Sequence, residues 1–279
     1  MRKLIINADD LGISLEVNAK IEDCIHRGVI TSSTLMANTP AFEDGVRIAK
    51  QYPQISIGVH LNLIEFKPLT NVDIFQKHGV IDSEGSFIEG AIFALPIDDE
   101  LKQAVFEEWD AQIAKVEAAG IVPSHVDSHQ HTHTIPALQE PLIRVLDLHR
   151  IKKVRRTIIP SIRLMLRGKK HPKVHLDKSK AYPVKKHNVF FRRFHLFAVI
   201  IANKHWNHKM ENSYVMTDSF YAFRNFFYDY DVLNLGGTSA TIELMCHPGH
   251  SAFQDETERL IKDNSWLPAG YQLISYNDL

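Results

Sequence analysis

The sequence predicts an α/β fold in which parallel strands form a sheet or a barrel. Short apolar runs rich in β-branched residues recur along the chain, and amphipathic helical segments separate them. Polar clusters follow several of these runs, as expected where functional groups gather at the carboxyl ends of parallel strands. The 279 residues are 44% hydrophobic and 23% charged, which suits one well-packed soluble domain.

The first half of the chain alternates predicted strands and helices. Residues 2–8 form an apolar run that predicts a buried strand, and Ser14 can cap a helix that ends near Gly28. We expect the further elements in this order: a strand over 29–36, a helix over 42–51, a strand over 55–62, a long connection over 65–96 and a helix over 98–119.

The second half continues the alternation around a basic segment. The patterns predict a strand over 122–129, a helix over 137–149, a strand over 241–247, a helix over 255–263 and a last strand over 270–276. We interpret residues 150–235 as a basic insertion or cap over the mouth of a barrel. The whole chain, 1–279, is then a single domain.

The basic segment separates the charges of the chain. Residues 150–210 hold 18 lysines and arginines and a single acid, Asp177, whereas the rest holds 14 basic and 32 acidic residues. Such a block can attract nucleic acid or an anionic membrane, or it can fold against the acidic remainder of its own chain or of a symmetry mate. Because the opposing charges nearly match, we expect the second arrangement and no nucleic-acid partner.

Targeting signals are not evident in the sequence. The N-terminal run turns acidic at Asp9 before an apolar stretch accumulates, and the apolar run 194–202 is too short to span a bilayer. Two cysteines, Cys24 and Cys246, do not make a disulfide framework. We therefore expect a cytoplasmic protein without a membrane span.

Ionisable residues follow four of the predicted strands. They are Asp9 and Asp10, then His60, then a histidine-rich segment over 125–133, and finally His247. A parallel fold brings all four strand ends to one face. Carboxylates and imidazoles without a cysteine pair suit zinc or a harder ion such as magnesium, and three protein ligands would leave a position for water.

Each of these residues, taken alone, has a simpler explanation. The Asp9–Asp10 pair could cap the following helix, His60 could be a hydrogen-bonded half-buried histidine, and His247 could be a turn residue. The histidine-rich segment is different, because an extended chain would direct alternate side chains to one side: His125, Asp127, His129, His131 and His133. That pattern favours a metal or active site in which some histidines bind the ion and others contact its ligands or the substrate.

The four segments 7–12, 58–61, 125–133 and 245–249 resemble the YdjC-like family, whose best-known members are chitooligosaccharide deacetylases. The resemblance covers about residues 1–149 and 236–279. It implies a distorted (β/α) barrel like those of glycoside hydrolases and polysaccharide deacetylases. It also implies one divalent metal ion, with magnesium or zinc the best match, that activates water to remove acetyl groups from N-acetylated amino sugars or short chitooligosaccharides.

The resemblance also implies roles for individual residues. Asp10, His60 and His129 are the implied metal ligands, Asp9 the carboxylate that deprotonates the attacking water, and His247 the acid that protonates the departing amine. From its position, Asp127 can fix a neighbouring imidazole as an acceptor. The other histidines of the segment are then expected to support the ligands or to contact the carbohydrate substrate: His125, His131 and His133.

Other functions stay open at the level of the sequence. The same barrel could carry a metal-dependent phosphoesterase or glycosidase, although the first needs more carboxylate ligands and the second two well-separated carboxylates. A protein that binds nucleic acid or a membrane through the basic insertion is a third alternative. The aromatic and basic residues over 190–194, with the apolar run that follows, could equally form a helix that covers the barrel or pairs two subunits as a homodimer.

Overall fold

The computed structural model describes residues 1–157, 189–233, 235–238, 240–262, 267 and 269–279. Its centre is a sheet of parallel strands in the order β4-β3-β2-β1-β6-β5, with β7 paired to β1. The strands are β1 (Arg2–Leu11), β2 (Ser32–Leu35), β3 (Ser56–Leu61), β4 (Val126–Ser128), β5 (Ser219–Ala222), β6 (Thr241–Cys246) and β7 (Tyr271–Leu273). The predicted α/β class is confirmed.

Short backbone bridges extend this sheet beyond its edge strand β4. Val126 of β4 pairs with Val154, and Lys153 pairs with Val215, which lies just before β5. The amide of Arg155 donates to the Val126 carbonyl at 3.0 Å and continues the contact along β4. The sheet is therefore curled toward itself, as the distorted barrel predicts. Within the segment 150–235, residues 153 and 154 form bridges to Val215 and Val126, and β5 pairs with β6.

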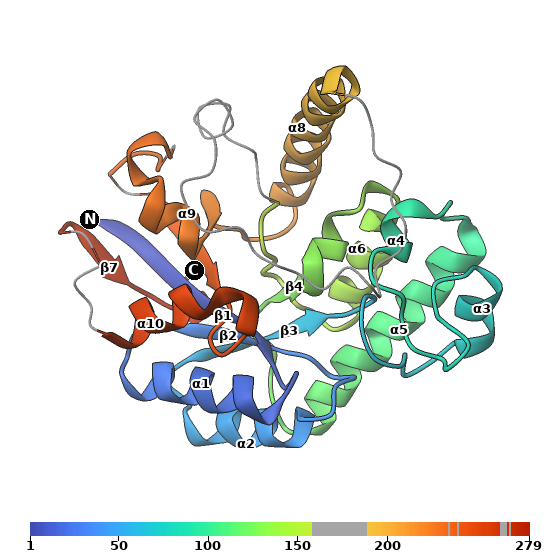
Figure 1. Cartoon of the computed structure of the whole chain (residues 1–279), viewed down its shortest axis with the longest axis horizontal. Helices are drawn as coiled ribbons and strands as arrows, with labels where there is room; N and C mark the ends of the chain where they lie inside the picture. The colour runs from blue at the N-terminus through green and yellow to red at the C-terminus, as the bar shows by residue number, and fades with distance from the viewer. Residues whose placement is uncertain (158–188, 234, 239, 263–266, 268) are drawn as a thin grey trace.

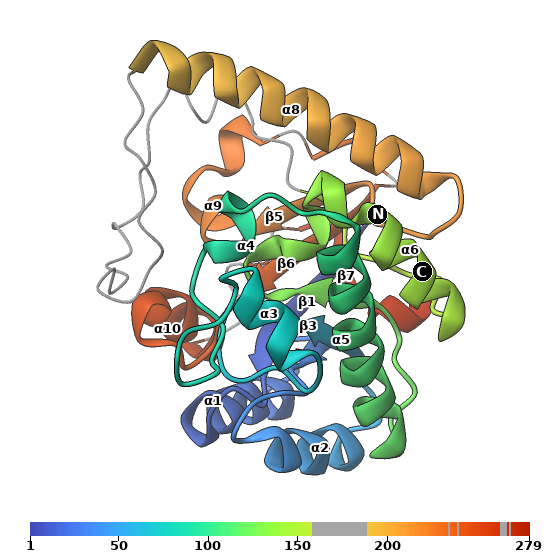
Figure 2. The ribbon, with the colours of Figure 1, turned by 90° about the vertical axis from the view of Figure 1, so that its right-hand side faces the viewer.

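Helices flank the sheet on both sides. They are α1 (Leu15–His26), α2 (Phe42–Gln51), α3 (Val72–Lys77), α4 (Ala91–Ala94), α5 (Asp99–Ala118), α6 (Gln139–Leu148), α8 (Val189–Glu211), α9 (Phe223–Tyr228) and α10 (Gln254–Lys262). Figures 1 and 2 show α1 and α2 on one side of the molecule and α8 on the opposite side. The Ser14 hydroxyl accepts from the Val17 amide at 3.2 Å. Ser14, and not Asp9 or Asp10, caps α1.

The strands are buried on both faces. Leu4, Ile5 and Ile6 of β1 have no exposed surface, which is typical of a parallel sheet that is covered on both sides. On α8, Trp206 and Met210 are also buried, so this helix packs on the rest of the protein in its second half. None of the helices in the described part of the chain has both the length and the apolar character that a membrane span requires.

Two details of the sequence prediction are wrong. The strand expected over 122–129 is shorter, since Val122 is 90% exposed and β4 spans only Val126–Ser128. The chain then turns into a short 3₁₀ helix in which Gln130 and His131 adopt left-handed backbone angles, with φ of 50° and 61°. The expected alternation of side chains therefore stops at His129. The long connection over 65–96 also contains α3 and α4.

Candidate active site

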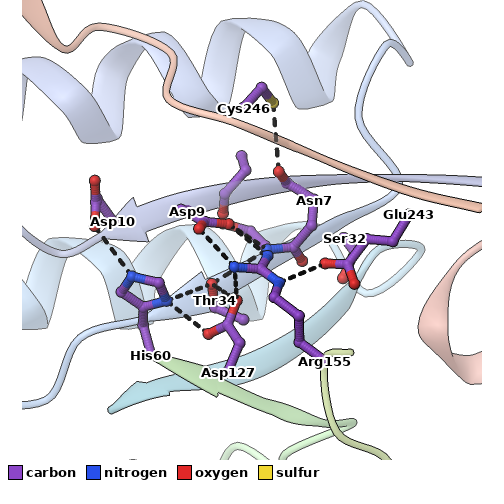
Figure 3. Close-up of polar contacts among 12 residues, drawn as sticks. Asn7, Asp9, Asp10, Ser32, Thr34, His60, Asp127, Arg155, Glu243 and Cys246 are labelled. Carbon is purple, nitrogen blue, oxygen red and sulfur yellow. Dashed lines mark hydrogen bonds and ion pairs between the residues drawn. The ribbon is translucent and has the colours of Figure 1, made fainter. Parts of the chain in front are cut away.

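A bulge near the end of β1 brings two consecutive carboxylates into one site. Neighbouring side chains on a regular strand point to opposite faces. Here the pairing of β1 with β2 loses its register between Ala8 and Leu11, and Asp10 has a left-handed φ of 68°. Both Asp9 and Asp10 consequently lie near His60 (Figure 3).

Three side chains from separate strand ends form a candidate metal centre. Oδ1 of Asp10 lies 2.8 Å from Nδ1 of His129 and 3.3 Å from Nε2 of His60. One ligand atom of each residue lies within 4.8 Å of those of the other two. Two imidazole nitrogens and a carboxylate oxygen are a donor set typical of a catalytic zinc, and they also bind other divalent ions. These residues therefore fit a divalent ion.

The second nitrogen of His60 is held by a carboxylate. Nδ1 of His60 lies 2.6 Å from Oδ1 of Asp127 and 3.1 Å from Oγ1 of Thr34. A histidine that is oriented in this way presents its other nitrogen to a metal. Burial lowers the pKa of His60, but Asp127 and Asp10 outweigh that effect and raise it to about 10. An ion bound at Nε2 would therefore have to displace a proton.

Arg155 is the cation at the centre of the site, and the sequence did not predict it. It is completely buried and lies within hydrogen-bond distance of three carboxylates. Its terminal nitrogens donate to both oxygens of Asp9 at 2.7 Å, Nη1 also lies 2.7 Å from Oδ2 of Asp127, and Nε donates to Glu243 at 2.8 Å. Figure 3 shows the guanidinium between these acids. One guanidinium thus holds three buried acidic side chains in place.

His247 lies beyond the end of β6 with its own acidic partner. Its backbone amide donates to Oε2 of Glu256 at 2.9 Å, and its ring nitrogen Nδ1 lies 3.4 Å from the same oxygen. The ring also stacks on Phe253 at 4.4 Å. Burial lowers the pKa of His247, but Glu256 together with Asp9 and Asp10 raises it to about 9. These acidic neighbours therefore favour the protonated form of the imidazole.

The remaining predicted histidines lie around the site but outside the candidate metal centre. His125 stacks on Tyr276 at 3.5 Å, and burial holds its pKa well below the usual value. The ring of His131 meets Phe220 edge-on at 5.7 Å. His133 contacts the Arg155 carbonyl through Nε2 at 3.3 Å. Burial also lowers the pKa values of His131 and His133, so all three rings are neutral at pH 7.

Removal of the Arg155 side chain should destabilise the folded protein and leave Asp9, Asp127 and Glu243 without their shared partner. We expect Arg155→Ala to lower the free energy of unfolding by about 3–5 kcal/mol, because three buried carboxylates lose their shared cation. The loss should shrink toward acidic pH, where these carboxylates bind protons. Arg47, which is half exposed beside Glu22 and Asp44, provides the control, and Arg47→Ala should cost below about 1 kcal/mol. Urea unfolding at pH 5 and pH 8 measures the loss for both variants. If Arg155→Ala lost the same unfolding free energy at both pH values, Arg155 would not be the shared partner of ionised carboxylates.

The sequence is similar to a known protein family and to named bacterial enzymes. The sequence profile of a family described as YdjC-like protein matches residues 3–270. A carbohydrate deacetylase of Halalkalibacterium halodurans is 37% identical over 145 residues, which are 52% of this chain and 58% of that protein. A carbohydrate deacetylase of Brevibacillus brevis is 37% identical over 153 residues, 53% and 57% of the two chains. The chain thus matches somewhat more than half the length of these relatives.

A solved structure has a similar overall fold. It is that of a proposed cellobiose-phosphate cleavage protein of Enterococcus faecalis V583, with a TM-score of 0.67 and 21% sequence identity. The superposition covers 99% of this chain and 98% of that one. The likeness supports the α/β architecture described above. The resemblance expected from the four sequence segments is confirmed by the family match.

Proposed function

This chain belongs to the YdjC-like family, and we propose that it is a metal-dependent hydrolase that removes acetyl groups from N-acetylated amino sugars or short chitooligosaccharides. The observation that carries the proposal is the candidate metal centre of Asp10, His60 and His129, with Asp9 and His247 beside it. The relatives that are carbohydrate deacetylases support the choice of substrate class.

Asp10, His60 and His129 would hold the ion in this proposal. When bound, a divalent ion supplies a Lewis acid and lowers the pKa of water from 15.7 toward about 7. Magnesium and zinc both fit the proposal, and the two imidazoles favour zinc. Asp127 keeps Nδ1 of His60 occupied at 2.6 Å, so that Nε2 stays directed toward Asp10.

Asp9 is the proposed proton acceptor. Its pKa is held well below the usual range because Arg155, with His60 and His247, outweighs the effect of burial. It is therefore ionised throughout the working pH range, as a proton acceptor must be before it acts. Both of its oxygens lie against the Arg155 guanidinium, which fixes the carboxylate in one orientation. Asn7 adds a third donor at 2.9 Å.

His247 is the proposed proton donor. In amide hydrolysis, the oxygen of water forms a bond to the acetyl carbon while Asp9 takes a proton from that water. The carbon–nitrogen bond then breaks, and the nitrogen must gain a proton to leave as an amine. A histidine that is protonated at neutral pH suits that donation, and Glu256 keeps the proton on His247. The products are acetate and a free amino sugar.

A substrate panel tests the reaction class. The purified protein is given N-acetylglucosamine, its phosphate, short chitooligosaccharides, p-nitrophenyl phosphate and p-nitrophenyl glycosides. We expect acetate from at least one acetylated sugar, with no phosphate or p-nitrophenol released. Phosphate release would instead favour the phosphoesterase, and cleavage between sugars the glycosidase. A metal analysis adds a second criterion, because two ions per chain would favour the phosphoesterase and one ion the deacetylase.

A further inference from the structure

Buried hydrogen bonds connect the C-terminal turn of the chain to the site. The hydroxyl of Tyr276 donates to Oε2 of Glu243 at 2.5 Å, and Oε1 of Glu243 accepts from Nε of Arg155 at 2.8 Å. All three side chains are completely buried. Through Arg155, Glu243 is therefore linked to Asp9 and Asp127.

Tyr276 reaches this position from the end of the barrel opposite the candidate metal centre. Strand β7 pairs with the first residues of β1, and the backbone amide of Tyr276 then donates to the hydroxyl of Ser56, the first residue of β3. A capping box between Ser275 and Asp278 closes the turn. His125 stacks on the Tyr276 ring with only 8° between their planes. The ring is thus fixed, with its hydroxyl against Glu243.

The hydroxyl of Tyr276 favours the ionised form of Glu243. Burial raises the pKa of Glu243 to about 7, and Asp127 and Asp9 act in the same direction. Arg155 and the Tyr276 hydroxyl oppose this rise. The neighbouring strands β1 and β5 place uncharged Ile5 and Phe220 in register with Glu243. Nearby, His125 is neutral, and Lys153 donates to the Tyr276 carbonyl at 2.5 Å.

We propose that Tyr276 is a positioning residue for the reaction: by donating to Glu243, it fixes the guanidinium of Arg155, which in turn orients Asp9 and Asp127. The inference rests on the proposed function. Tyr276 acts only through other side chains, and it lies outside the residues 3–270 that match the family profile. An ionised Glu243 gives Nε of Arg155 a charged acceptor, and loss of that charge weakens one of the contacts that hold the guanidinium.

The variant Tyr276→Phe keeps the stacked ring and removes only the hydroxyl. We expect kcat to fall on the order of tenfold, with KM changed less than about twofold, because a supporting contact is lost and no substrate contact is touched. The acidic limb of the kcat–pH profile should move to higher pH, since ionised Glu243 has lost a donor. Ser275→Ala is the matched control, because it loosens the same turn and leaves the hydroxyl in place. Its pH profile should equal that of the unmodified protein.

A double-variant comparison shows whether Tyr276 acts through Glu243. Glu243→Gln removes the ionisation, so adding Tyr276→Phe should change the pH profile no further. A double-variant pH profile therefore measures the coupling through activity.

A readout independent of activity is the loss of unfolding free energy caused by Tyr276→Phe. This loss should grow as the pH rises through 7, because the hydroxyl stabilises the ionised carboxylate of Glu243 most. In a protein that carries Glu243→Gln, the loss caused by Tyr276→Phe should not vary with pH.

Two results would overturn the positioning role. One is a Tyr276→Phe protein whose kcat–pH profile is that of the unmodified protein. The other is a loss of stability that does not vary with pH, which would leave Tyr276 a purely structural residue. A failure of the proposed function looks different, because the unmodified protein itself would then release no acetate from any substrate. The pH dependence of stability would still decide whether Tyr276 and Glu243 are coupled.

Discussion

The Asp9→Asn variant should retain its metal and lose most of its turnover. We expect kcat to fall by about 10²–10⁴-fold, the usual contribution of a positioned proton acceptor. An amide can still accept from one nitrogen of Arg155, but it has no charge and cannot take a proton from water. Metal content by mass spectrometry and acetate release measure the two parts of the expectation.

A control separates this effect from a general loss of a carboxylate. Asp110 lies on α5, 2.8 Å from the ring of His149. The side chain of Asp110 is 40% exposed. Asp110→Asn should leave both metal content and kcat unchanged. If Asp9→Asn worked at a rate close to that of the unmodified protein, Asp9 would not be the proton acceptor.

His129→Ala should abolish metal binding and turnover together. The change removes one of three proposed ligands, leaving Asp10 and His60 as an incomplete set. We expect the bound ion to be lost on dialysis and acetate release to fall to the background. Calorimetric titration with zinc and an acetate assay measure the two losses in the same preparation.

His149 offers a matched histidine for this experiment. Like His129, it lies against acidic side chains, here Asp110 at 2.8 Å and Glu117 at 2.9 Å. His149→Ala should keep both the ion and the activity. An unchanged zinc affinity in His129→Ala would remove His129 from the ligand set and leave the contact with Asp10 a structural one.

Local sequence signals predicted the main elements well. Capping residues and stop signals located α1 and α5, because the hydrogen bonds of Ser14 and Asp98 depend on neighbours only three residues away. The predicted strand over 122–129 failed since its apolar residues do not all enter the sheet. Val122 is exposed, and the left-handed turn at Gln130 and His131 has no glycine to indicate it.

The candidate site was only partly visible in the sequence. The parallel topology explains why Asp10, His60 and His129 meet, since each lies at or just after the carboxyl end of its strand. Arg155 was hidden among the other basic residues of its segment, and only the fold shows that it faces Asp9. Glu243 carried a signal that could have been used, because it is the single acid in the buried strand β6. A buried carboxylate requires a partner.

The other partners of the site depend on distant pairing. Thr34 and Tyr276 come from β2 and from the C-terminal turn, and neither is unusual in its local sequence. The charge asymmetry of the chain has a partial explanation in Arg155 and Arg156, which pair with acids outside residues 150–210. Residues 158–188 of that segment lie outside the described residues.

Acetate release by the metal-stripped protein shows whether the deacetylation depends on the ion at Asp10, His60 and His129. The protein is treated with a chelator, and zinc, magnesium, manganese, cobalt or nickel is added back singly with an N-acetylated sugar or chitooligosaccharide. We expect no acetate after stripping, recovery with one ion per chain, and no recovery in His129→Ala. Full acetate release by the stripped protein, or none with any ion although one is bound, would contradict this expectation.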